Sequence, residues 1–242
     1  MLIGIMLIDQ LEFLTNCFSG RPLDCAIRQL WDFAFVGADI DGNLLPLHHP
    51  FTVPLVDQVN QWARFASGIL PRPQAQTITA WWIGINDTGD TVNNASISDF
   101  HSFFEEEMDS FFSAVETAYS TGLRGMHLFL TVPPGERSPG YLGSPSAATL
   151  QAHVDEFNKI LLQHARIFAQ NHAATPVLVF DAHAWFNYAL DNAPALGFTN
   201  TSGFCECTNE KGFFWYNSGH PTELVHQQMA GALEEFLLSV SI

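Results

Sequence analysis

The chain has 242 residues, of which 47% are hydrophobic and only 14% are charged. That composition supplies enough apolar side chains for a core and too little charge for a disordered protein. Nine Lys and Arg against 25 Asp and Glu give a formal net charge of −16 at pH 7. Because nucleic acids and anionic membranes both attract basic surfaces, this charge argues against either as a partner. We expect a single domain over residues 1–242.

The N-terminal segment reads MLIGIMLI and has no basic residue before it. It is too short to span a membrane and lacks the features of a signal peptide. We favour a helix that continues to Leu14, because Leu7, Leu11 and Leu14 keep helical spacing, over a substitute strand in the same place.

The chain has four cysteines, at positions 17, 25, 205 and 207. An even number is compatible with two disulfides, and a bridge between Cys17 and Cys25 would close a short loop. Cys205 and Cys207 are separated by one residue, which we expect to be too close for an easy mutual bridge. The spacing also disfavours a four-cysteine zinc site.

Apolar runs of strand length alternate with amphipathic helical stretches along the chain. The predicted strands are residues 30–36 (LWDFAFV), 77–85 (TITAWWIGI), 126–132 (MHLFLTV) and 176–180 (PVLVF). The predicted helices cover residues 99–119, residues 146–170 and a last stretch that begins after Thr222 as N-cap. This alternation predicts a doubly wound parallel sheet, which binds ligands beyond the carboxyl ends of its strands. The positions at those ends are Gly37, Asn86, Pro133 and Asp181.

Three short motifs lie near these strand ends or just before the last helix: FVGAD (35–39), GINDTGD (84–90) and WYNSGHPT (215–222). In this order they resemble blocks II, III and V of the SGNH (GDSL) esterase family. The similarity runs from about Leu11 to the C-terminus and is greatest to fungal secreted esterases of carbohydrate-esterase family 16. The resemblance implies a three-layer α/β/α fold with a mainly parallel, flavodoxin-like sheet. It also implies a secreted acetylesterase that acts on small acylated carbohydrates without cofactor or metal.

The residue types fit that chemistry. Gly37 has no side chain, so its backbone N–H can approach a substrate oxygen, and Asn86 can offer a neutral N–H to the same oxygen. His220 can take a proton from a nucleophile and return it to the leaving alcohol. The resemblance assigns the first two as oxyanion donors and His220 as the base. Each has a simpler interpretation: a turn glycine, a turn former or glycosylated Asn, and a solvated histidine before a helix. Asn86 also begins one of three N-x-S/T triplets, the others beginning at Asn94 and Asn200, which together lean weakly towards secretion.

The sequence departs from the family pattern in two places. The family's first block, Gly-Asp-Ser, carries the nucleophilic serine at the end of the first strand, and this sequence contains no such triplet. Gly-x-Ser-x-Gly is also absent, and Ser19 falls in the segment that resembles the region after the family's first helix, so we do not assign it as the nucleophile. We therefore expect a domain that is N-terminally truncated relative to the family and lacks or substitutes its first strand. In addition, Asn217 occupies the position of the usual block-V Asp, so either Asn217 or another acid, such as Asp181, orients His220.

Three further features receive structural interpretations. His48 and His49 have no acidic partner at metal-ligand spacing and are assigned to a loop. The run 105–107 of three glutamates is interpreted as a solvated helix face, and the adjacent Trp81 and Trp82 as core residues on opposite faces of a strand. The sequence thus predicts an ester hydrolase that is impaired without its serine block. The alternatives are a non-catalytic protein that binds acylated sugars, or an incomplete gene model of an ordinary esterase.

Overall fold

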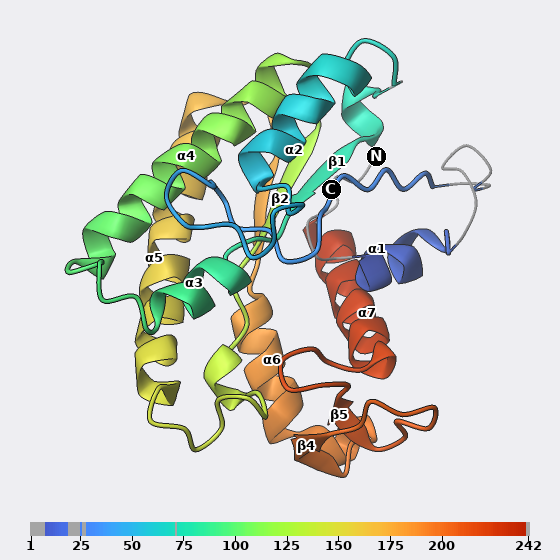
Figure 1. The fold of residues 1–242 in the computed structure, drawn as a ribbon. Coiled ribbons are helices and arrows are strands. Elements are labelled where there is room, and N and C mark those ends of the chain that lie inside the picture. Colours follow the sequence, from blue (N-terminus) through green and yellow to red (C-terminus); the bar gives the residue numbers. More distant parts are fainter. Residues whose placement is uncertain (1–7, 19–24, 26–27, 71, 241–242) are drawn as a thin grey trace.

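The computed structural model describes residues 8–18, 25, 28–70 and 72–240. The fold has three layers, α/β/α, around a parallel sheet of strand order β1-β2-β3 (Figure 1). The strands are β1 (Ile78–Trp81), β2 (Met126–Leu130) and β3 (Val177–Phe180). In register, Trp81 of β1 lies opposite Phe129 of β2, and Leu130 of β2 lies opposite Phe180 of β3. The sequence prediction of an α/β fold with a parallel sheet is therefore confirmed.

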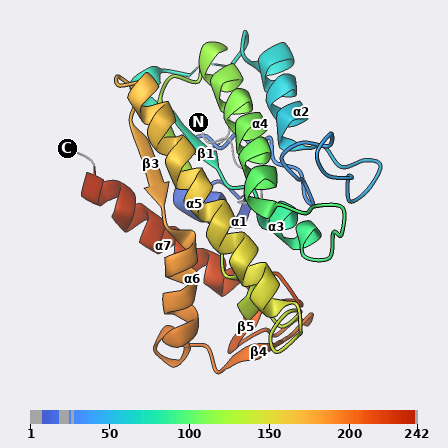
Figure 2. The same ribbon diagram turned by 90° about the vertical axis from the view of Figure 1, so that its left-hand side faces the viewer.

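One face of the sheet is covered by α2 (Leu55–Gln61), α4 (Phe100–Ser120) and α5 (Ala147–Asn171). Figure 2 shows α4 lying between the other two helices. A π-helical segment, Trp62–Ala66, continues α2. Aromatic rings fill this layer: Trp81 stacks on Phe129 at a centroid distance of 6.3 Å, and Phe111 of α4 meets both.

The opposite face is covered by α1 (Ile8–Thr15), α6 (Ala182–Asp191) and α7 (Glu223–Val240). Successive side chains of an extended chain point to opposite faces of a sheet. Trp81, the last residue of β1, accordingly packs in the core on the α4 side, and Trp82, the next residue, packs in the core on the α7 side. Both tryptophans are at most 3% exposed, so their assignment to opposite cores is confirmed.

Shorter elements connect these layers. Helix α3 (Ile85–Thr91) follows β1, and a second small parallel sheet pairs β4 (Asn200–Phe204) with β5 (Phe213–Trp215). Short 3-10 helices occupy Gln74–Gln76, Gly135–Arg137 and Ala193–Leu196. Within the described ranges, no helix is long and apolar enough to cross a membrane.

The predicted helices and three of the four predicted strands are present. The prediction for 77–85 is too long, because the strand ends at Trp81 and α3 begins at Ile85. The prediction of a strand at 30–36 is wrong. There the Asp32 carboxylate accepts the Ala34 N–H at 2.9 Å, which occupies a donor that a ladder would need. No strand of the described residues pairs with the outer edge of β1.

All four cysteines are paired in two disulfides. Cys17 and Cys25 form a disulfide, as the short loop suggested. The expectation for Cys205 and Cys207 is wrong: they form the second disulfide, because the single spacer leaves their Cα atoms 5.2 Å apart, within the ordinary range. With every cysteine oxidised, a four-cysteine zinc site is excluded. The N-terminal helix is present from Ile8 to Thr15, and the predicted part before it, like Ser19, lies outside the described residues.

Candidate active site

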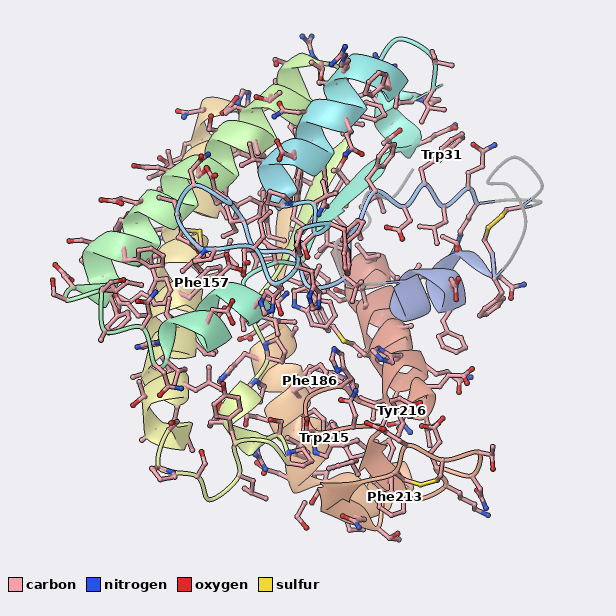
Figure 3. All side chains as sticks on the ribbon, viewed as in Figure 1. Trp31, Phe157, Phe186, Phe213, Trp215 and Tyr216 are labelled. Atoms are coloured by element: carbon pink, nitrogen blue, oxygen red, sulfur yellow. A yellow bond between two sulfur atoms is a disulfide. The ribbon has the colours of Figure 1, made fainter. Side chains whose placement is uncertain are left out.

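A cavity of about 320 Å³ lies at the carboxyl ends of β1 and β2. Its wall is built from the segment that follows β1 with α3, the loop after β2, the start of α5 and the turn before α7. Figure 3 shows Phe186 and Trp215, two of its apolar lining residues, on neighbouring elements. Of the four strand-end positions, Asn86 and Pro133 line this cavity, whereas Gly37 and Asp181 do not.

Asn86 joins the cavity wall to the loop that carries Gly37. Its side-chain Nδ2 donates a hydrogen bond of 2.9 Å to the backbone oxygen of Ala38. Gly37, the residue before, has a φ of +73°, a left-handed conformation that favours glycine. The two predicted oxyanion donors therefore lie in adjoining segments, although only Asn86 contacts the cavity.

The loop between β5 and α7 presents His220 at the opposite part of the wall. The backbone of this loop folds back on itself, since Tyr216 N–H donates to the His220 oxygen at 2.8 Å and Trp215 pairs with Pro221. Thr222 precedes α7 as predicted, and its hydroxyl donates to the Phe213 oxygen at 3.1 Å.

Asn217 orients the imidazole of His220. Asn217 Oδ1 lies 2.9 Å from His220 Nδ1 and also accepts the backbone N–H groups of Gly219 and His220, at 3.0 and 2.8 Å. Two backbone donors on the same atom identify it as the oxygen of the amide and not its NH₂ group. Nδ1 must then carry the ring proton, which leaves Nε2 as the acceptor that a general base needs.

The alternative orienting acid, Asp181, has another role. It is the N-cap of α6, where Oδ1 accepts the Ala184 N–H at 2.9 Å and the Thr131 hydroxyl at 3.0 Å. Across the described residues, the side chain of His220 is hydrogen-bonded to Asn217 alone. Asp181 therefore caps α6, and Asn217 is the residue that contacts the imidazole of His220.

A group of carboxylates lies directly behind the Asn86 segment. Asp87 accepts the Ile40 N–H at 2.8 Å, and Glu107 of α4 is its buried carboxyl neighbour. Burial, reinforced by Asp87, raises the pKa of Glu107 to about 11, which identifies Glu107 as the protonated carboxyl of the two. Burial, then the charges of Asp87 and Asp90, raises the pKa of Asp39 to about 8.

This group corrects two sequence interpretations. Glu107 is fully buried, so the run 105–107 is not a uniformly solvated face; only Glu106 is exposed. His48 does have an acidic partner, because its Nε2 lies 2.8 Å from Asp90 Oδ2 at the end of α3. Sequence reasoning missed the contact between His48 and Asp90 because it joins residues that are distant along the chain.

The chain is similar to known esterases. No family model matches it. An acetylesterase of Thermothelomyces thermophilus is 27% identical over 214 residues, which cover 85% of this chain and 68% of that protein. The structure of an acetyl xylan esterase, AlAXEase, superposes with a TM-score of 0.52 at 10% identity over 98% of both chains. A carbohydrate esterase family 3 structure from Talaromyces cellulolyticus gives a TM-score of 0.47 at 15% identity, over 100% of this chain and 98% of that one. The sequence similarity to the acetylesterase is consistent with an SGNH/GDSL-like esterase family. The AlAXEase superposition agrees with the three-layer α/β/α fold.

Proposed function

We propose that this protein is an ester hydrolase of the acetylesterase type, acting on small acylated carbohydrates, with His220 as the base. The observation that carries the proposal is the shared cavity: Asn86 and His220 come from separate motifs and line the same 320 Å³ space at the carboxyl ends of the strands. The similarity to an acetylesterase supports the choice of ester.

The geometry supports a proposed role for each residue. Asn86 supplies an amide N–H for the oxygen that becomes negative as the ester carbonyl is attacked, and the backbone of Gly37 supports the loop beside it. His220, held by Asn217, accepts a proton at Nε2 and returns it to the leaving alcohol. Asn217 fixes the ring orientation but contributes no negative charge to stabilise an imidazolium, unlike the Asp of a triad.

The 242 residues as printed include no Gly-Asp-Ser, and we propose that they are impaired in turnover for this reason. Loss of a triad serine lowers kcat by about 10⁶ in a serine protease. We therefore expect slow, saturable release of acetate from acetylated xylo-oligosaccharides, which His220→Ala abolishes and His49→Ala, outside the cavity, does not change. Acetate release that is insensitive to His220→Ala would exclude this site.

A fluorophosphonate probe tests the impairment separately. We expect no serine of this chain to be labelled. Stoichiometric labelling of one serine, lost in His220→Ala, would show that the chain holds its own nucleophile and is a competent hydrolase.

A second candidate function is binding without turnover. The lining of the cavity includes the aromatic side chains of Trp82, Tyr141 and Trp215, a type of side chain that suits the apolar faces of sugars. Calorimetric binding of an acetylated oligosaccharide without acetate release, lost in Asn86→Ala, would favour this function over hydrolysis. For either function we propose a location outside the cell, and a small acylated molecule, neither nucleic acid nor membrane, as the ligand.

A further inference from the structure

Asp39, His48 and Asp90 converge beside the cavity from two segments of the chain. Asp39 and His48 belong to the loop before α2, and Asp90 lies in α3. His48 Nε2 is 2.8 Å from Asp90 Oδ2 and 4.0 Å from Asp39 Oδ1. One donor atom from each residue lies within 4.8 Å of the other two.

Asp39 is the residue of this group whose carboxyl oxygens lack hydrogen-bond partners. Its side chain is 0% exposed. Burying a carboxyl group without a hydrogen-bond partner is costly even when it is protonated, and a bound cation would compensate this cost by pairing with its ionised form. The neighbouring Asp87 differs, because its Oδ1 accepts the Ile40 N–H at 2.8 Å. Within the described ranges, His48 is the one ion-pair partner of both Asp39 and Asp90.

We propose that Asp39, His48 and Asp90 bind one divalent transition-metal cation, for which Zn²⁺ is the best fit. This inference is independent of the proposed hydrolase activity, because it concerns the orphaned Asp39 carboxylate and not the residues that would act on an ester.

The donor set selects the class of cation. Ca²⁺ and Mg²⁺ take oxygen ligands, whereas an imidazole nitrogen with two carboxylates suits Zn²⁺. Ligands held tetrahedrally at about 2.1 Å from Zn²⁺ lie about 3.4 Å apart, and the present separations of 2.8 and 4.0 Å fall on either side of that value. The cation reaches the buried Asp39 from the side of His48 and Asp90, whose side chains are 32% and 35% exposed.

Such a cation joins the loop 37–48 to α3. The same loop carries Gly37, and its Ala38 oxygen accepts the hydrogen bond from Asn86. A metal at this position therefore reinforces the contact that holds the wall of the cavity, and it stabilises the folded chain by binding only that state.

The experiment titrates Zn²⁺ into the chelator-treated protein by calorimetry, with thermal unfolding in parallel. We expect one high-affinity Zn²⁺ site per chain. At a free Zn²⁺ concentration of about a hundred times Kd, Tm should rise by about 5–10 °C. Asp39→Asn and His48→Gln should each weaken Zn²⁺ binding by at least about tenfold. Asp39→Asn keeps the shape of the side chain and removes its ability to ionise, so the variant should still fold without metal, which circular dichroism verifies.

Matched controls separate this site from surface histidines. His49→Gln changes the adjacent exposed histidine, and Asp57→Asn changes an exposed aspartate of α2; both should bind Zn²⁺ within about twofold of the wild type. Unchanged binding in both Asp39→Asn and His48→Gln would overturn the proposal. A Ca²⁺ response that equals the Zn²⁺ response and survives His48→Gln would overturn it as well.

Discussion

Phe157 of α5 packs directly on the backbone of Gly84, the residue that precedes α3. A Cβ atom added to Gly84 would overlap the Cζ and Cε1 atoms of the Phe157 ring and would lie 2.9 Å from Val132 Cγ2. Gly84 also has a φ of +108°, outside the region that other residues adopt readily. This close approach seats α5 against the segment that follows β1 and so fixes the start of the helix that carries Asn86.

Gly84→Ala should therefore lower the free energy of unfolding by about 3 kcal/mol or more, because overpacking and backbone strain add. Urea denaturation measures the change. The matched control is Gly231→Ala in α7, where a Cβ meets nothing within 4 Å and the helix gains up to about 1 kcal/mol. A Gly84→Ala protein as stable as the wild type would mean that Phe157 can move aside.

Asn217 holds its loop through one oxygen atom that accepts three hydrogen bonds. Asn217→Ala should destabilise the protein by about 1–3 kcal/mol, whereas Asn217→Asp keeps an acceptor in place and should cost much less. Nitrogen NMR of the His220 ring should report the Nδ1–H tautomer in the wild type and a mixture in Asn217→Ala. The same tautomer ratio in both proteins would show that Asn217 does not orient the ring.

The sequence was sufficient to predict most elements of this fold. Periodic apolar residues located α4 and α5 within a residue or two, and the buried strands β2 and β3 read as short apolar runs. These signals are local, because each element buries one continuous face. The run 30–36 carries the same local signal but forms no strand, since pairing depends on a partner strand that the run itself does not encode.

The candidate site also combines residues that the sequence could predict with contacts that it could not. Asn86, Asn217 and His220 lie in short motifs whose spacing could be recognised, and the structure brings Asn86 and His220 to one cavity. The contact between His48 and Asp90 leaves no local trace in the sequence, because it depends on where the loop 37–48 meets α3. Glu107 differs, because it lies three residues after Phe104 and four before Phe111, on the buried face of α4 that the apolar periodicity indicates.

His127 gives the protein a specific sensitivity to acid. Its Nδ1 accepts the Trp81 indole N–H at 3.1 Å, its Nε2–H donates to the Leu123 oxygen at 2.8 Å, and burial lowers the pKa of its ring from 6.5 to about 4. Between those two pKa values the ring is protonated in the unfolded chain but not in the folded chain. The free energy of unfolding therefore falls as the pH drops, by up to about 3 kcal/mol. The stability difference between wild type and His127→Gln should therefore shrink from pH 7.5 to pH 4.5, whereas His49→Gln should follow the wild type. Parallel curves for wild type and His127→Gln would show that the buried ring is protonated in the fold.

Glu107 links stability to pH in the opposite direction to His127. Its pKa is raised from 4.5 to about 11, by burial first and then by Asp87, so in the range between them the folded chain keeps a proton that the unfolded chain has released. Stability is therefore lost as the pH rises through this range. Glu107→Gln places a neutral amide of the same shape beside Asp87, and it removes the proton linkage. In chelator-containing buffer the variant should exceed the wild type in unfolding free energy by at least about 1 kcal/mol at pH 8, with the gain shrinking towards pH 5. Glu106→Gln, on the exposed side of the same helix turn, should show no such gain. If Glu107→Gln were instead less stable at pH 8, Glu107 would have to be ionised in the fold, and Asp87 would be the protonated carboxyl of the two.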